Sequence, residues 1–167
     1  MLDALKILKE KGYTFVCQFV GGETAEIGAV QFSEEVDKRK LNDRVAYVGR
    51  KVGEEKNTFF QQADIFILPT MNECFPLVIL EAMEYKLPVI STNEGGIPDM
   101  VKDGENGLIC EKQNPVSLAD CIAKLLDDEE LRVKMGNAGY EKFCREFTLD
   151  QFENRMRDIL NQNLFSS

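Results

Sequence analysis

The pattern of hydrophobic and polar positions alternates between two periods along this chain. Several short runs are almost continuously apolar, rich in Val, Ile and Phe and bounded by Gly, Pro, Asp or Asn, and they occupy residues 14–20, 44–48, 64–68, 88–91 and 107–110. Such runs are typical of strands that are buried on both faces of a parallel sheet. The pattern therefore predicts a set of interior strands.

Helical periodicity fills the segments between these runs. Apolar side chains recur at helical spacing in two of them: Leu2, Leu5 and Leu8, then Ile79, Leu80 and Met83. Strands that alternate with helices over this length indicate an α/β fold. We expect a doubly wound, Rossmann-like and mostly parallel sheet with right-handed crossovers.

Beyond the last apolar run the chain predicts helices only. Asn114 followed by Pro115 is typical of a helix N-cap and the first helical residue, and an apolar stripe at helical spacing follows. We therefore expect a single domain over residues 1–167, in which strands and helices alternate over about 1–113 and a helical tail covers about 114–163.

Composition and charge exclude several classes of function. The chain has no histidine, which rules out histidine general bases, Ser/His/Asp and Cys/His nucleophile systems and histidine-bound zinc within these residues. The 20 Lys and Arg residues against 29 Asp and Glu residues give a net charge of −9. Nucleic acids and anionic membranes are repelled by such a charge, so we expect no nucleic-acid partner and at most peripheral membrane contact.

The cysteines are odd in number and widely spaced: Cys17, Cys74, Cys110, Cys121 and Cys144. They form no C-x-x-C pair of the kind used in redox or zinc sites. We interpret them as reduced thiols that pack as small buried hydrophobes. Together with the lack of any apolar run near the ~20 residues that cross a bilayer, this predicts a cytoplasmic location. We also expect no cofactor and no metal site.

The loop after the apolar run at 64–68 carries the most chemical information. In a doubly wound sheet, ligands bind beyond the carboxyl ends of the strands, where this loop would lie. Pro76 marks the predicted first residue of the following helix. Unpaired N–H groups at a helix start attract anions, so the amides of Cys74, Phe75 and Leu77 can hold a phosphate, whereas Pro76 has no N–H to offer.

Two carboxylates bracket this predicted helix start. Glu73 lies in the loop, and Glu81 lies about 7.5 Å along the helix axis from Pro76, since each helical residue rises about 1.5 Å. The two groups are too far apart to share a proton, and an ionised carboxylate only accepts hydrogen bonds, so each suits a pair of sugar hydroxyls. A phosphate between two such carboxylates describes a nucleotide sugar. The alternative is that Glu73 is an ordinary loop residue and Glu81 a solvated helix position.

The segments NECFPLVILEAM and LPVISTNEGGIPDMVKDGENGLI resemble the donor-binding half of retaining glycosyltransferases with the two-domain GT-B architecture, in particular the family 4 group, also described as glycosyl transferases group 1. The resemblance spans essentially the whole chain. It implies that Glu73 contacts the donor sugar at the catalytic centre and that Glu81 holds the ribose hydroxyls. It also implies that the amides of Cys74, Phe75 and Leu77 meet the sugar and the phosphate.

Two further segments resemble the family less specifically. AYVGRKV is similar to the family's strand and turn beside the nucleobase, which makes Arg50 and Lys51 candidates for the base or the phosphate. A solvated surface charge is the alternative for each. Gly95 and Gly96 resemble the next family loop, and the alternative is a tight turn that needs a positive φ. No Asp-x-Asp occurs, which disfavours the metal-dependent glycosyltransferases.

The chain also departs from the family. Lys86 stands where many relatives have glycine, so we expect a strained or displaced helix end there. Relatives begin this half with a strand and a basic loop for the donor pyrophosphate, after an acceptor-binding N-terminal domain, and we expect all of these to be missing from these residues. Without that strand, the runs at 14–20 and 64–68 have free edges, so we expect them to pair directly or to be covered in a homodimer.

The residues thus lead to one expected function and two rivals. We expect the donor-binding part of a glycosyltransferase that moves a sugar from a nucleotide diphosphate sugar to an acceptor hydroxyl with retention, and that is inactive without its acceptor domain. One rival is a sugar phosphorylase built on the same half-domain. The other is a non-catalytic nucleotide-sugar-binding or interaction fragment.

Overall fold

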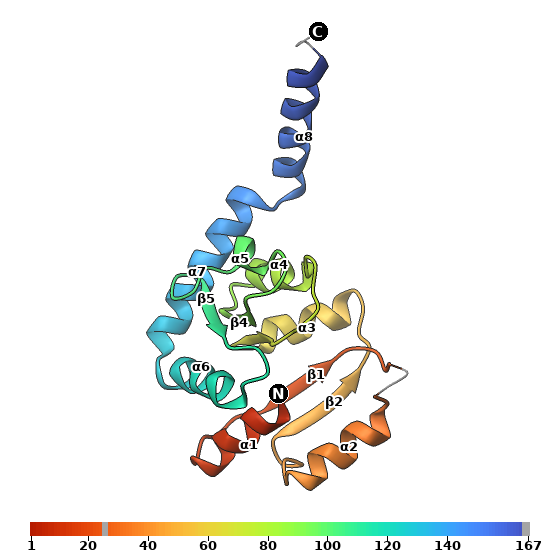
Figure 1. The fold of residues 1–167 in the computed structure, drawn as a ribbon, viewed down its shortest axis with the longest axis vertical. Helices are drawn as coiled ribbons and strands as arrows, with labels where there is room; N and C mark the ends of the chain where they lie inside the picture. Colours follow the sequence, from red (N-terminus) through yellow and green to blue (C-terminus); the bar gives the residue numbers. More distant parts are fainter. Residues whose placement is uncertain (25–26, 165–167) are drawn as a thin grey trace.

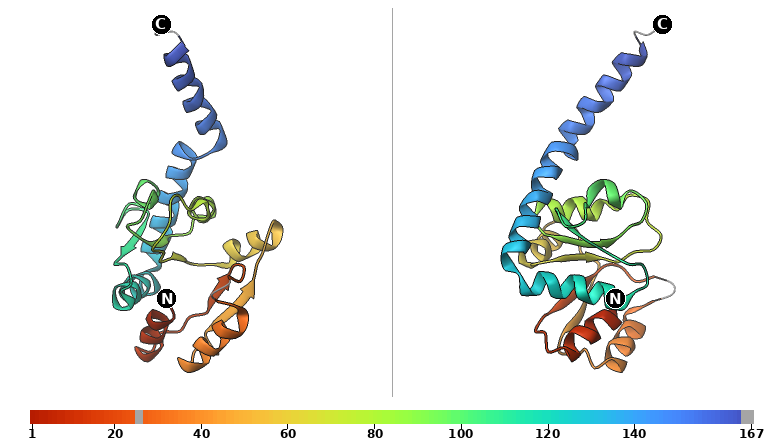
Figure 2. Two further views of the ribbon diagram at one scale, coloured as in Figure 1. Left: turned by 45° about the vertical axis from the view of Figure 1, so that its right-hand side comes forward. Right: turned by 60° about the vertical axis from the view of Figure 1, so that its left-hand side comes forward.

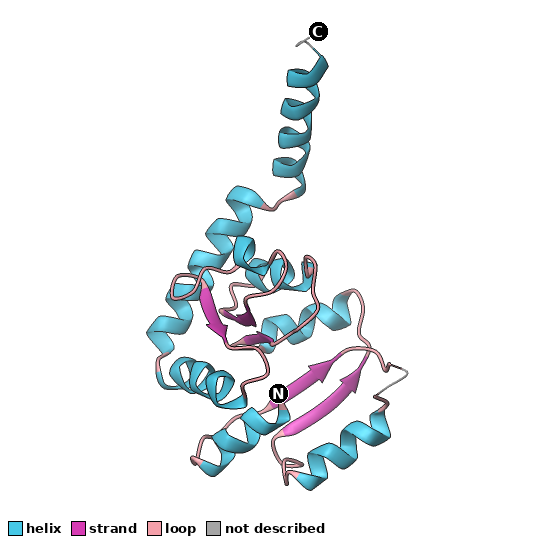
Figure 3. Cartoon of the chain, viewed as in Figure 1, coloured by secondary structure: helices cyan, strands magenta, loops and turns pink. Residues whose placement is uncertain are grey.

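Strands and helices alternate up to Cys110, and helices alone follow (Figure 3). The computed structural model describes residues 1–24 and 27–164. Its elements are α1 (Leu2–Glu10), β1 (Cys17–Val20), α2 (Ala29–Lys38), β2 (Val45–Gly49), α3 (Glu54–Gln62), β3 (Phe66–Leu68), α4 (Leu77–Glu84), β4 (Val89–Thr92), α5 (Ile97–Met100), β5 (Gly107–Cys110), α6 (Pro115–Asp127), α7 (Glu129–Glu146) and α8 (Leu149–Leu164) (Figure 1). This is the α/β arrangement with a helical tail that the sequence predicts.

All strand pairs are parallel, but they form two sheets. β1 pairs with β2, and the second sheet has the order β3–β4–β5. Direct pairing of the runs at 14–20 and 64–68 is therefore a wrong prediction. Phe19 of β1 and Ile67 of β3 instead pack against one apolar cluster that contains Leu5 of α1. Strands of both sheets thus contact the same apolar cluster, and the homodimer stays a prediction.

The two sheets differ in how deeply their strands are buried. Every residue of β4 is buried, as the apolar run predicts for a strand covered on both faces. Along β1, half-buried and exposed residues alternate. Val16 and Val20 are 75% and 42% exposed, so the prediction of a strand buried on both faces is wrong for β1. On one face of β1, Phe19 packs against Phe32 of α2, whereas Gln18 and Val20 on the other face are exposed.

The helical tail begins at the predicted residue, and its last helix, α8, projects away from the sheets and the other helices, which form the body of the structure. The Asn114 side chain accepts hydrogen bonds from the amides of Val116 and Ser117, which caps α6. α6 packs beside α1, and α7 packs against α4. α8 projects from the body (Figures 1 and 2) and exposes large apolar side chains, namely Leu149, Phe152, Met156, Ile159 and Leu160. Among the described residues, no helix is long and apolar enough to cross a membrane.

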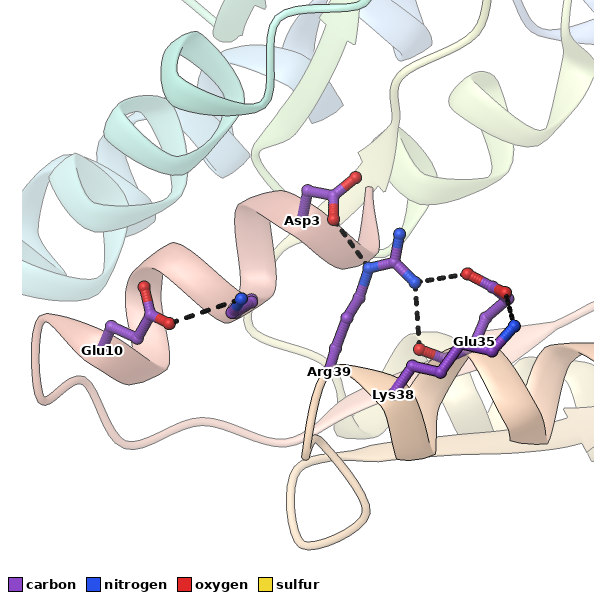
Figure 4. Close-up of polar contacts among 6 residues, drawn as sticks. Asp3, Glu10, Glu35, Lys38 and Arg39 are labelled. Carbon is purple, nitrogen blue, oxygen red and sulfur yellow. Dashed lines mark hydrogen bonds and ion pairs between the residues drawn. The ribbon is translucent and has the colours of Figure 1, made fainter.

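A polar network fastens α2 to α1 (Figure 4). Arg39 follows α2, and its Nε donates to Asp3 Oδ1 at 2.7 Å while its Nη1 donates to Glu35 Oε2 at 2.5 Å. Lys38 Nζ also donates to Glu35, at 2.6 Å. The hydrogen bond from Arg39 lowers the pKa of Asp3, and the hydrogen bonds from Lys38 and Arg39 lower the pKa of Glu35. These carboxylates therefore stabilise the α1–α2 contact in their charged form.

Candidate functional site

The loop between β3 and α4 is fixed from the end of β4. Ser91 Oγ donates to the carbonyl oxygen of Leu68 at 2.7 Å, and Thr92 Oγ1 donates to that of Thr70 at 2.6 Å. Both hydroxyl-bearing residues are buried. Because a buried hydroxyl needs a partner, these bonds are costly to break and hold the first residues of the loop in register with β4.

The same loop is closed on its other side by two glycines. Gly95 has φ +50°, and a Cβ there would lie 2.2 Å from the carbonyl oxygen of Glu73. The amide of Gly96 donates to the carbonyl oxygen of Cys74 at 2.6 Å. The interpretation of a tight turn with a positive φ is confirmed for Gly95, whereas Gly96 has φ −86°. The close approach adds a second reason for glycine at position 95, since any side chain there would displace the backbone of Glu73.

The start of α4 presents free backbone donors. Pro76 is the N-cap and Leu77 the first helical residue, so the prediction of Pro76 as first helical residue is one position early. Within the described chain, the N–H groups of Cys74, Phe75 and Leu77 donate to no protein acceptor. They lie where the helix dipole is positive, and they are the amides that the sequence singles out as anion donors.

The two candidate carboxylates have different surroundings. Glu81 lies on α4, and its Oε1 accepts a hydrogen bond from Lys56 Nζ of α3 at 2.6 Å. Glu73 is half-buried in the loop, and among the described residues its carboxylate has no hydrogen-bond or ion-pair partner. Sequence patterns do not point to Lys56, because 25 residues separate it from Glu81 and no local period links them. Only the packing of α3 beside α4 brings the two together.

The two other predicted cations lie after β2. Arg50 is exposed, and Lys51 is half-buried with its Nζ 3.5 Å from Glu55 Oε2. In the described part of the chain, neither forms an ion pair with Glu73 or Glu81. Glu73 and the loop amides of Cys74 and Phe75 thus lie just before α4, and Glu81 lies on it, whereas no contact within the described residues joins Arg50 or Lys51 to them.

Two surface depressions lie apart from the candidate carboxylates. A depression of about 230 Å³ lies between β1 and α2, beside Phe19, Gly22 and Phe32, and one of about 520 Å³ lies beside β5 and α6. Neither depression is lined by Glu73 or Glu81. Within the described residues, no group of three or more His, Cys, Asp or Glu side chains could hold a metal ion.

The cysteines fall into two groups. Cys110 is buried, and burial raises its pKa; burial also raises the pKa of Cys17 and of Cys121 to about 11. Cys74 and Cys144 are exposed, so the expectation that all the cysteines pack as buried hydrophobes is wrong for these two. Cys74 lies in the loop between β3 and α4, outside the regular elements.

Two solved structures share this fold. Sucrose-phosphate synthase from Thermosynechococcus elongatus superposes with a TM-score of 0.84 and 26% identity over 99% of this chain and 43% of its own. Anabaena HepE, solved in complex with UDP, has a TM-score of 0.86 and shares the fold at 20% identity, over 96% of this chain and 44% of its own. The fold is that of the GT-B glycosyltransferases.

The sequence comparison defines the family. The profile described as Glycosyl transferases group 1 matches residues 1–142, and the chain belongs to this family. N-acetyl-alpha-D-glucosaminyl L-malate synthase of Bacillus anthracis is 34% identical over 127 residues, which are 74% of this chain and 33% of that protein. The chain thus spans about a third of this curated relative and under half of the solved structures named above.

Proposed function

We propose that this chain is the donor-binding part of a retaining glycosyltransferase. It would bind a nucleotide diphosphate sugar, whose sugar passes to an acceptor hydroxyl. The observation that carries this proposal is the set of three N–H groups, those of Cys74, Phe75 and Leu77, that have no acceptor within the described residues. In the sequence they lie between the carboxylates of Glu73 and Glu81. The family membership and the complex of HepE with UDP support the same assignment.

Each group has a role that follows from its chemistry. The loop amides and the positive end of α4 hold the leaving diphosphate without a net basic surface. Glu81 accepts hydrogen bonds from the ribose hydroxyls, and Lys56 holds its carboxylate in place. Glu73, whose carboxylate has no protein partner in the described chain, accepts hydrogen bonds from the donor sugar at the reacting carbon.

Catalysis here would be electrostatic and positional. Departure of the sugar leaves negative charge on the diphosphate, and preorganised amides stabilise it with no metal required. Arg50 or Lys51 would add positive charge at the base or phosphate after donor binding. The acceptor would be held by a further domain outside these 167 residues, and retention and cytoplasmic location stay predictions.

The test is titration of the isotope-labelled chain with UDP, followed by amide chemical shifts. We expect shifts at Cys74, Phe75 and Leu77, with an affinity near millimolar because the basic pyrophosphate loop and acceptor domain are not within these residues. Inorganic phosphate is the comparison that separates the phosphorylase rival: it should shift the same amides far less than UDP. Equal shifts with phosphate would favour the phosphorylase, and no shift with either would contradict the donor-binding proposal.

A further inference from the structure

Phe147 occupies the break between the last two helices. α7 ends at Glu146, and the amide of Phe147 still donates to the carbonyl oxygen of Phe143 at 2.9 Å. Thr148 Oγ1 then accepts a hydrogen bond from the amide of Gln151 at 3.4 Å, so a new helix starts one residue later. α8 leaves the body at this point in a new direction (Figure 2).

The ring of Phe147 reaches the candidate donor loop. Its centroid lies 6.3 Å from that of Phe75, with an interplanar angle of 54°. The Phe75 ring also lies over Gly96, where an added Cβ would be only 2.5 Å from Phe75 Cδ2. Phe75 is 40% exposed, so contacts with Gly96 and Phe147 are what keep this ring from turning freely in solvent.

Phe147 is itself held in place by neighbouring elements. Lys142 Nζ lies 5.9 Å from the centre of the Phe147 ring and donates a hydrogen bond to the carbonyl oxygen of Asp99 in α5. Phe147 also packs against the buried cluster that includes Ile97 and Met100 of α5. The ring is therefore attached to α5 and α7, and Phe75 is the loop residue whose ring it touches.

We propose that Phe147 is a positioning residue for the donor loop and acts through Phe75. The backbone of Phe75 carries one of the proposed phosphate amides, and the Cys74 carbonyl beside it accepts the Gly96 amide. Fixing the Phe75 ring fixes the direction of these peptide groups, so Phe147 presets the loop for an anion although it offers the ligand no group. This inference rests on the proposed function for its effect on binding, but not for its effect on the loop.

The experiment measures opening of the loop and binding of the ligand separately. Hydrogen exchange of the Gly96 amide reports opening of the loop, and UDP titration reports binding, both well below the melting temperature. The variants are Phe147→Ala and Phe147→Tyr, which keeps the ring. The control is Tyr140→Ala, which removes an aromatic ring from α7; that ring lies under Lys86, 5.0 Å from its Nζ.

We expect Phe147→Ala to speed Gly96 exchange and to weaken UDP binding by about two- to tenfold each, which is the range for loss of an aromatic pair. Phe147→Tyr and Tyr140→Ala should leave both close to the wild type. In a double-mutant cycle, Phe75→Ala should produce the same losses, and adding Phe147→Ala should change little more, because the two rings act through one contact.

The outcomes that overturn the proposal are specific. If Phe147→Ala lowers the melting temperature but leaves Gly96 exchange and UDP affinity unchanged, the ring contributes only to stability and does not position the loop, so the proposal is wrong. If the wild type shows no UDP shifts, the proposed function fails, while Gly96 exchange still decides whether Phe147 holds the loop. If Phe147→Ala does not fold, Phe147→Leu replaces it, because leucine removes the ring but keeps apolar volume. Phe147→Leu must then also speed Gly96 exchange and weaken UDP binding.

Discussion

Lys56 of α3 donates a hydrogen bond from its Nζ to Glu81 Oε1 of α4 at 2.6 Å, which joins the two helices that flank β3. The pair is partly exposed, with side-chain exposures of 32% and 38%. It is therefore accessible to a ligand. Within the described residues the second oxygen of Glu81 has no hydrogen-bond partner, so it can accept hydrogen bonds from a diol. A carboxylate already oriented by a cation loses less freedom when it binds a second partner.

Glu81→Gln should weaken UDP binding more than Glu73→Gln, because UDP carries the ribose but not the donor sugar. A lost charge-assisted hydrogen bond is worth roughly 1.5–3 kcal/mol, or about tenfold to a hundredfold in affinity. Lys56→Met should weaken UDP binding in the same direction and by less, since the Glu81 carboxylate itself remains. Calorimetry or shift titration measures all three variants, and equal losses for Glu73→Gln and Glu81→Gln would contradict the assignment of roles.

A thiol reagent should label Cys74 and Cys144 first in the folded chain near neutral pH. Both are exposed, whereas burial raises the pKa of Cys17 and of Cys121 to about 11, and thiolate is the reactive form. Peptide mapping after short labelling measures the order. Saturating UDP should slow labelling of Cys74 and leave Cys144 unchanged, so Cys144 is the internal control. Protection of neither or of both would argue against a ligand at the loop.

Gly136→Ala should destabilise the protein, although alanine is the better helix former by about 1 kcal/mol. A Cβ at Gly136 would lie 1.9 Å from the carbonyl oxygen of Lys86, so the helix or the α4 end must move, and overpacking of this kind costs about 1–3 kcal/mol or more. Gly139→Ala is the control in the same helix, because its nearest neighbour would be Met83 Cγ at 3.5 Å. Urea unfolding should separate the two variants, and equal stabilities would refute this packing argument.

Acid should weaken the contact between α1 and α2. Arg39 lowers the pKa of Asp3, so the native state binds the proton less readily than the unfolded chain does. The stabilisation is complete above the ordinary carboxylate pKa of about 4 and is lost as the pH falls through the lowered native value. Because the pair is largely exposed, it contributes less than about 1 kcal/mol.

The variant Arg39→Met tests this acid dependence. It should be less stable than the wild type at neutral pH and should lose less further stability on acidification, as measured by urea unfolding at about pH 6 and about pH 3. Arg155→Met on α8 is the matched control, because it removes a guanidinium far from this network. If the free energy of unfolding falls by the same amount between these two pH values in the wild type and in Arg39→Met, the network does not contribute.

The exposed face of α8 should promote self-association of this chain. Phe152, Met156 and Ile159 are 60%, 40% and 51% exposed, and apolar patches of this kind favour contact with a second surface. Changing these three residues to Gln should reduce association in sedimentation experiments with little change in melting temperature. The control is a double variant with Glu153→Gln and Arg157→Gln, which leaves the apolar face of α8 intact. A wild type that stays monomeric at high concentration would contradict both this prediction and the predicted homodimer.

The local sequence pattern was sufficient to predict most secondary-structure elements and the position of the candidate site along the chain. Apolar runs placed β2, β4 and β5 within a residue or two, because a strand in a parallel sheet must be apolar along its length. The Asn114 cap follows from side-chain chemistry within three residues. The loop with Glu73, and Glu81 along the next helix, could likewise be predicted, since they lie within one strand–loop–helix unit.

Other features depended on contacts between distant segments. Lys56 on Glu81, Gly95 over the backbone of Glu73 and Phe147 on Phe75 each join residues that no sequence period relates. Tertiary packing also decided three further features, namely the exposure of β1, the separation of the two sheets and the exposure of Cys74. Sequence by itself determines which residues can form a helix, a strand or an anion-binding turn, because these depend on near neighbours. Tertiary structure alone decides which of those surfaces become buried or paired, because that depends on where the rest of the chain packs.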